Sequence, residues 1–425
     1  MWYDKITFLF KNKDLRKKII FVMFLFVVFR IAANVPIPGI GSENLRRFFA
    51  ENQVFGLLNI FSGGALSNFS IVLMGLGPYI TATIILQLLT MIFPFLEKLY
   101  KEEGEAGRQK FNQYGRLLTI PLAAFEGYGM LTLFQGQGII TGLTPMLMVS
   151  SIVTIVAGAM FLMWLGEIIT EQGMGNGISL LIFAGIVASL PVNIFQTFVS
   201  WDPSKIPSYL IFFALSVIII AGVVLITEAR RNIPVSYAKR VRGSKMYGGT
   251  STYLPLNVNP AGVIPIIFAL SILLFPGMVA GFLGTAPGLV GTIANSAVAF
   301  FNNPWVHGML YFILVIIFTY FYTAVTFDPK TIAENLQKMG GFVPGVRPGK
   351  STSDFLSHIL NRVLFVGALS LGLIAVLPNI VAGMTGVTGF TFLIGGTSLL
   401  IIVSVVLDTM RQINAQLQMR EYDAF

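Results

Sequence analysis

Two glycine-rich stretches are the parts of this sequence whose residue types and spacing first suggest chemistry. Gly345–Ser351 reads GVRPGKS and ends in Gly-Lys-Ser, as a phosphate-binding loop does. Such a loop needs a glycine five residues before its last glycine, and Pro344 occupies that position here. No strand is predicted before it, so we reject a nucleotide site. Gly173–Gly177 reads GMGNG between two apolar segments, where we predict a tight interhelical turn.

Residues for catalysis or metal binding are scarce. The chain has no cysteine and two histidines, His307 and His358, which are far apart in sequence. Arg30 and Glu126 lie within apolar segments, where ionisable residues are functional candidates. Glu126 is interpreted as a partnered or cavity-facing acid, or as part of an ion-coupling site. No nucleophile–base pair or pair of catalytic acids is evident, so we predict no catalytic residue, no cofactor and no metal.

Composition indicates an integral membrane protein. Of 425 residues, 55% are hydrophobic and 11% are charged, whereas soluble domains carry about 25% charged residues. A membrane-spanning helix needs about 20 apolar residues, and we predict ten such segments in an all-α polytopic fold. The predicted spans are Ile19–Val35, Phe69–Phe93, Leu117–Phe134, Pro145–Leu165, Gly177–Val199, Ser208–Thr227, Ala261–Leu283, Gly308–Phe327, Ile359–Ile380 and Val387–Leu407.

Positive charge is distributed unequally between the two sides of the predicted bundle. All 28 Lys and Arg residues lie in the N-terminal arm, in alternate loops or in the tail, except Arg30, Arg46, Arg47 and Lys205. Because basic loops stay in the cytoplasm, we predict that both termini are cytoplasmic.

The stretch from Gly56 to Pro94 predicts an enclosed cavity. Leu57–Ser67 is short, apolar and broken by Gly63-Gly64, so it cannot span a membrane. Backbone of that kind is tolerated at membrane depth where protein buries it or where it lines a watery cavity. We therefore expect a small movable piece inside the bundle.

Two apolar pairs occur at a spacing of four residues, which places each pair on one helix face. They are Leu76 with Ile80, and Ile178 with Ile182. The spacing alone fits ordinary packing, lipid contact or a hydrophobic constriction that gates a pore.

Two long basic loops, 228–260 and 328–358, separate the later spans. They serve either as topological anchors or as a docking surface for an anionic or acidic-faced partner. Five spans in each half also allow an inverted repeat. The predicted parts are an N-terminal arm 1–18, an N-terminal half 19–199, a C-terminal half 200–407 and a tail 408–425.

Eight runs in order resemble the SecY/Sec61-alpha family of protein-translocation channels. They are VFRIAANVPIPGI (28–40), NIFSGGALS (59–67), PYITATIILQLLT (78–90), EGEAGRQKFNQYGR (103–116), FLMWLGEIITEQGMGNGISLLIFAGIV (161–187), NPAGVIPIIFA (259–269), AENLQKMGGFVPGVRPGKST (333–352) and GGTSLLII (395–402).

The resemblance implies two pseudosymmetric inverted halves of five helices that close like a clamshell around a pore. It implies a lateral gate between spans two and three on one side and spans seven and eight on the other. The pore-ring positions fall on Leu76, Ile80, Ile178, Ile182, Ile267 and Ile401, where Leu76 departs from the family's usual isoleucine. The plug falls on Asn59, Ile60, Phe61, Ser62, Gly63, Gly64, Ala65, Leu66 and Ser67.

The resemblance also implies function and partners. The family's critical loop arginine falls on Arg347, and Lys239, Arg240 and Lys245 are further docking positions. Expected partners are SecE-like and SecG-like small subunits, a SecA-like ATPase motor, the translating ribosome, an unfolded preprotein with its signal sequence, and membrane lipid. The expected location is the bacterial inner membrane. The alternatives are an ion-coupled secondary transporter of a small solute and a structural membrane scaffold.

Overall fold

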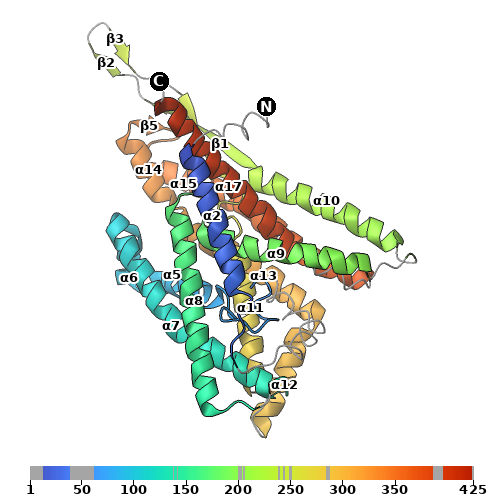
Figure 1. The fold of residues 1–425 in the computed structure, drawn as a ribbon. Helices are drawn as coiled ribbons and strands as arrows, with labels where there is room; N and C mark the ends of the chain where they lie inside the picture. Colours follow the sequence, from blue (N-terminus) through green and yellow to red (C-terminus); the bar gives the residue numbers. More distant parts are fainter. Residues whose placement is uncertain are drawn as a thin grey trace.

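The structure is a computed structural model that describes residues 13–38, 62–136, 138–140, 142–199, 203, 206–237, 240–242, 245–247, 251–283, 288–385 and 396–423. It is a bundle of helices with a small β-sheet at one end (Figure 1). Helix α2 begins and α17 ends at that same end, which we call the sheet end (Figure 1). This agrees with an even number of spans.

Each predicted span contains a helix in the described part of the chain. The first half contributes α2 (Lys13–Ala32), α5 (Gly77–Ile92), α7 (Gly104–Gly136), α8 (Pro145–Glu171) and α9 (Gly177–Val199). The second half contributes α10 (Ile206–Glu228), α11 (Ile264–Leu283), α13 (Pro304–Thr326), α15 (Lys350–Thr385) and α17 (Gly396–Asp423). Three shorter helices connect them: α6 (Pro94–Lys101), α12 (Leu289–Asn302) and α14 (Pro329–Lys338).

By length and hydropathy, five of the described helices are long and apolar enough to cross a membrane. A sixth span arises if α5 and α6, which meet at a 110° bend, are taken together. Shorter apolar stretches occur within α9, α10 and α11, at Gly177–Val192, Phe213–Glu228 and Ile264–Leu273.

The helix contacts repeat between the two halves. In the first half α5 contacts α7, α7 contacts α8, α8 contacts α9, and α2 contacts both α8 and α9. In the second half α11 contacts α13, α13 contacts α15, α15 contacts α17, and α10 contacts both α15 and α17. When the five helices of each half are numbered in chain order, the same pairs of helices are in contact. The two halves therefore share one packing arrangement.

The predicted span Phe69–Phe93 is wrong at its start. Residues 69–76 form turns, and the helix begins only at Gly77. Phe69 and Gly75 have φ values of 46° and 57°, which an α-helix does not accept. Instead, the Ile37 N–H donates to the Phe69 carbonyl, and the Ile71 N–H donates to the Val35 carbonyl. The start of the predicted span therefore pairs with the chain that follows α2. In the last predicted span, residues 387–395 lie outside the described residues.

Strands occur in both long loops, which the sequence did not predict. β1 (Arg230–Tyr237) pairs antiparallel with β4 (Ser251–Asn257) and with β5 (Gly341–Phe342). β2 (Arg240–Arg242) and β3 (Lys245–Tyr247) form a separate hairpin. Ile233 and Val235 point to the same face of β1 and are buried, as alternation along a strand requires. The sheet therefore joins the two loops into one structure.

Candidate functional site

All six predicted ring residues lie in or against one apolar cluster. Leu76, Ile80, Ile182 and Ile401 are buried in it, and Ile178 and Ile267 pack against it half-buried. They come from α5 and its preceding turn, α9, α11 and α17. Both halves therefore contribute to this cluster. The cluster contains many other residues, so the assignment of these six to a ring stays a prediction.

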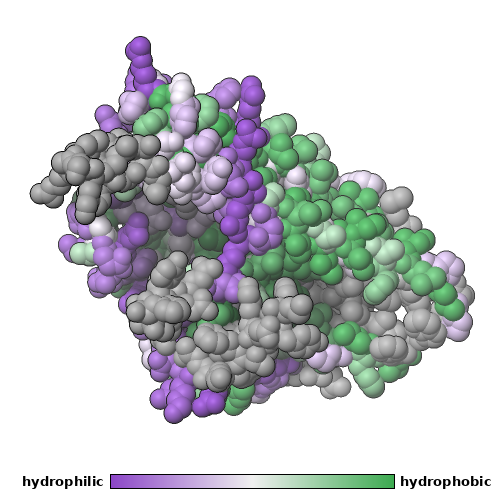
Figure 2. All heavy atoms as spheres, turned by 90° about the horizontal axis from the view of Figure 1, so that it is seen from above, coloured by the Kyte–Doolittle hydropathy of each residue, from purple (hydrophilic) through white to green (hydrophobic). Residues whose placement is uncertain are grey.

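A cavity of about 170 Å³ lies directly beside three ring residues. Ile80, Ile178 and Ile267 line it together with Phe268 and Tyr322 on the side of α11 and α13. Ile264, the first residue of α11, also lines it, and α11 is the helix that follows β4, so the cavity lies on the sheet side of the ring. Figure 2 views the molecule from that end, where hydrophilic residues gather and the face is hollowed between them.

Part of the cavity wall is polar, which the sequence analysis missed. Tyr79, Thr83 and Gln87 line it from α5 and recur every fourth residue, so they share one helix face. Gln87 is buried, and its Oε1 has no hydrogen-bond partner among the described residues. The signal was present as polar residues at i, i+4 and i+8 within an otherwise apolar helix.

The predicted plug lies on the opposite side of the ring. Asn59, Ile60 and Phe61 lie outside the described residues, and we call Ser62–Ser67 the plug segment. A Cβ built on Gly75 would lie 3.7 Å from Ser62 Cα, and one built on Gly63 would lie 3.1 Å from Gly185 Cα. The plug segment thus approaches the turn before α5 and the middle of α9.

The same order recurs on two helices distant in sequence. Along α9, Asn176 meets the cavity, Ile178 and Ile182 follow, and Gly185 meets the plug segment. Along α5 the order runs in reverse, from Gly75 beside the plug segment through the ring positions to Gln87 at the cavity. The cavity, the predicted ring residues and the small Gly-broken segment therefore follow one another in the same order along both helices.

The two halves meet on both sides of the predicted ring residues. On one side α11 contacts α5 and α7. Phe268 of α11 packs edge-on against Phe318 and Tyr322 of α13, with ring centroids 6.0 and 6.1 Å apart. The seam between the two halves on this side lies between α5 and α7 of the first half and α11 of the second, whereas the Phe268 rings pack within the second half.

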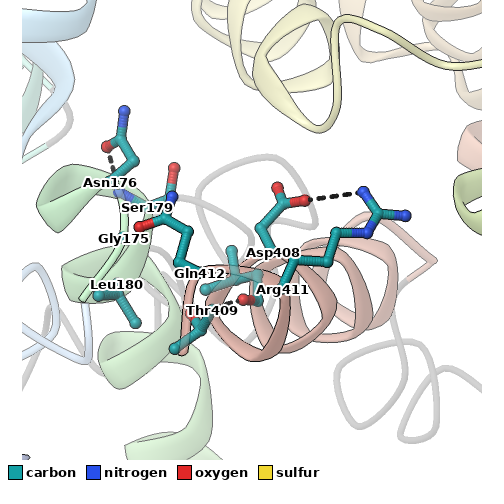
Figure 3. Close-up of a pocket in the computed structure, with 9 residues that line it drawn as sticks. Gly175, Asn176, Ser179, Leu180, Asp408, Thr409, Arg411 and Gln412 are labelled. Atoms are coloured by element: carbon teal, nitrogen blue, oxygen red, sulfur yellow. Dashed lines mark hydrogen bonds and ion pairs between the residues drawn. The ribbon is translucent and has the colours of Figure 1, made fainter. Parts of the chain in front are cut away.

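On the other side α9 contacts α17, and a pocket of about 240 Å³ lies between them (Figure 3). The predicted tight turn 173–177 is confirmed here: Gly173 and Gly175 have φ values of 72° and 137°. The Asn176 side chain accepts hydrogen bonds from the backbone N–H groups of Ile178 and Ser179 at 3.1 Å. Gln416 of α17 donates to the Gly173 carbonyl at 2.6 Å, which ties the two halves together.

The predicted docking residues occupy the sheet end. Arg347 is exposed in the turn between β5 and α15, and its guanidinium has no partner in the described structure. Its carbonyl accepts from Thr352 Oγ1 at 2.8 Å, and Val346 beside it packs on the sheet core. A strand, β5, does precede this turn, contrary to the prediction, yet the spacing still excludes a phosphate loop. Arg240 and Lys245 lie on the β2–β3 hairpin, and Lys239 lies outside the described residues.

The base of the sheet is bound to α17. Arg411 donates to Glu228 at 2.7 Å and to the Thr227 carbonyl at 2.7 Å, at the junction of α10 and β1.

The other ionisable residue within a predicted span, Glu126, is buried on α7 at 6% exposure, with its carboxylate beside Gly77 of α5. The described residues contain no group of three or more His, Cys, Asp or Glu side chains that could hold a metal ion.

The fold defines a class of protein: a polytopic helical membrane protein whose two similarly packed halves share one apolar cluster. A family model described as SecY matches residues 70–410. The protein translocase subunit SecY of Streptomyces galbus is 42% identical over 434 residues, covering 98% of both chains. That of Thermus thermophilus is 44% identical over 423 residues, covering 97% of this chain and 95% of the relative. The chain belongs to the SecY family.

Solved structures confirm the predicted ten-helix fold. A protein-conducting channel matches with a TM-score of 0.65 at 20% identity, covering 93% of this chain and 90% of that one. A SecY structure concerned with the plug domain matches at 0.62 and 21% identity, covering 92% and 90%. Sec61 in the canine ribosome–channel complex matches at 0.62 and 20% identity, covering 93% and 90%.

Proposed function

We propose that this chain is the channel subunit of a bacterial protein translocase. It conducts unfolded preproteins across the plasma membrane and releases transmembrane segments sideways into the bilayer. The observation that carries the proposal is the order of the cavity, the predicted ring residues and the plug segment along α5 and α9. Membership of the SecY family supports the same function.

An apolar ring suits a cargo without fixed sequence. A polypeptide in transit presents every type of side chain, so a pore cannot depend on specific hydrogen bonds. Isoleucine and leucine side chains at Leu76, Ile80, Ile178, Ile182, Ile267 and Ile401 close a narrow gap by packing and by excluding water. The same side chains yield to a passing chain, because no polar contact has to be broken.

Lateral release uses the seam between α5 and α7 on one side and α11 on the other. When this seam parts, a segment inside the path is exposed to lipid. A segment of about 20 apolar residues then partitions into the bilayer, whereas a polar segment stays in the path.

The sheet end faces the cytoplasm in this proposal, as do both termini, because nearly all the basic residues lie on that side. Transport needs an energy source. Because no catalytic residues are evident in the sequence, we place that source outside this chain. A SecA-like ATPase or the translating ribosome supplies the energy. Either one docks on the sheet of β4, β1 and β5, on the β2–β3 hairpin and on Arg347. SecE-like and SecG-like subunits complete the assembly in the membrane.

The secondary-transporter alternative is not supported by the relatives, which are named as translocase subunits. The test is reconstitution of the purified chain with its small subunits in vesicles. With the motor and ATP added outside, an unfolded secretory protein is expected to become protected from protease. Uptake of small solutes without protection of the secretory protein would contradict the proposal.

A further inference from the structure

Arg30 is an intramembrane charge that the proposed function does not use. It lies in the last turn of α2, within the first predicted span, and is half-buried. An arginine at such depth is costly unless it has a partner or reaches water. The contacts of its side chain therefore indicate what it does.

The guanidinium of Arg30 is directed at the plug segment. Its Nη1 donates a hydrogen bond to the Gly63 carbonyl. A Cβ built on the next residue, Gly64, would lie 3.8 Å from the same nitrogen. Within the described part of the chain, Gly63 is the hydrogen-bond partner of this side chain.

The backbone of the plug segment leaves one carbonyl for Arg30 to bind. The carbonyls of Ser62, Gly64, Ala65 and Leu66 each accept from a backbone N–H group three to five residues later. Among the described residues the Gly63 carbonyl has no backbone donor, and Arg30 supplies one. A buried carbonyl without a donor is unfavourable, so this hydrogen bond completes the pairing of the segment.

Packing fixes the same residue from two sides. A Cβ on Gly63 would lie 3.2 Å from the ring of Phe29 on α2 and 3.1 Å from Gly185 Cα on α9. Gly63 also has a φ of 67°, which favours glycine. The segment is thus wedged between α2 and α9, directly beyond Ile182, with Arg30 holding its backbone.

We propose that Arg30 is the latch that holds the plug segment over the apolar ring in the resting channel, a positioning role that rests on the proposed function. The hydrogen bond is made to the main chain of the plug segment. It therefore breaks when a passing chain moves the segment, and it forms again when the segment returns. A charged donor gives a stronger bond than a neutral one. Displacement exposes the guanidinium to the water of the opened path, where it is solvated.

The test measures resting ion conductance in planar bilayers for Arg30→Met, which keeps the length of the side chain and removes its charge. Loss of a hydrogen bond to a charged group changes the displaced fraction on the order of 10-fold or more, and the leak should rise accordingly. The same substitution is then made in a chain lacking Asn59–Ser67. If Arg30 acts through the plug, it adds no further leak there.

A cross-link separates the latch from a folding defect. Asn34 and Asn68 are joined by a 3.1 Å hydrogen bond, and the chain has no cysteine of its own. In the Asn34→Cys, Asn68→Cys background, a short thiol cross-linker should hold the segment and suppress the leak of Arg30→Met. A leak that persists after cross-linking, or that also rises in the plug-deleted chain, would overturn the latch. No leak on deletion of Asn59–Ser67 alone would overturn the plug assignment itself.

Discussion

Substitution of Ile182 by glycine tests whether the ring is where we place it. Ile182 and Leu181 are neighbours on α9, with exposed fractions of 4% and 1%. Neighbouring side chains on a helix point in directions about 100° apart. Leu181 Cδ1 would lie 3.6 Å from a Cβ on Gly166, so it packs against α8. Ile182 is proposed to face the path, which makes Leu181→Gly a matched control.

The two substitutions should cost nearly the same stability. Truncation of a buried Leu or Ile costs about 2–5 kcal/mol, and glycine in a helix interior adds about 1 kcal/mol. Only Ile182→Gly also opens the path. It removes the whole side chain from one layer of the ring, and a water molecule needs only about 30 Å³. Water and ions should therefore enter through the gap left by Ile182→Gly, whereas Leu181→Gly leaves the path closed.

The assay is resting conductance of purified channels in planar bilayers, at matched channel number, with thermal unfolding in detergent as the stability control. We expect similar unfolding temperatures for the two variants and a raised conductance for Ile182→Gly alone. Equal leaks from the two variants would refute the placement of the ring, because loss of packing in general would then explain both.

Three further outcomes are expected. Deletion of Asn59–Ser67 should raise resting conductance while preprotein import continues, because the segment is proposed to cover the ring at rest and to be displaced during transport; an unchanged resting leak would count against the plug. Arg347→Lys should insert normally but import poorly, and Arg347→Glu should nearly abolish ATP-dependent import, because lysine lacks the guanidinium fork; wild-type import by the lysine variant would reduce Arg347 to a topological anchor. Gly158→Ala should lower the free energy of unfolding by about 1–3 kcal/mol, since its Cβ would clash with the Ile71 carbonyl oxygen, whereas Gly129→Ala meets nothing within 4 Å and should not lower it.

Hydrophobic runs predicted the helices well because membrane spans must satisfy their backbone internally. They failed at Phe69–Leu76, which is as apolar as the helix that follows. Hydropathy measures burial and not φ, and only the left-handed φ at Phe69 and Gly75 ends the helical pattern. The β1–β4 pairing was missed because its partners lie in a basic loop, where alternation of two buried residues, Ile233 and Val235, is a weak signal.

The site was less predictable than the fold. A spacing of four residues gives Leu76 and Ile80 a common face but does not say what that face meets. The structure adds the neighbours: Ile80 and Ile178 come from different helices and line one cavity. The hydrogen bond from Arg30 to Gly63 joins residues 33 positions apart, and no local pattern encodes such a contact.

The central claim is that an unfolded chain passes through the ring, and cross-linking tests it most directly. Because the protein has no cysteine, a single Ile80→Cys can be paired with one cysteine in a secretory protein stalled during ATP-driven import. The control is Phe365→Cys, whose side chain is 59% exposed on the outside of α15. We predict a disulfide between the stalled chain and Ile80→Cys, and none with Phe365→Cys. Cross-linking at Phe365→Cys but not at Ile80→Cys would contradict passage through the ring.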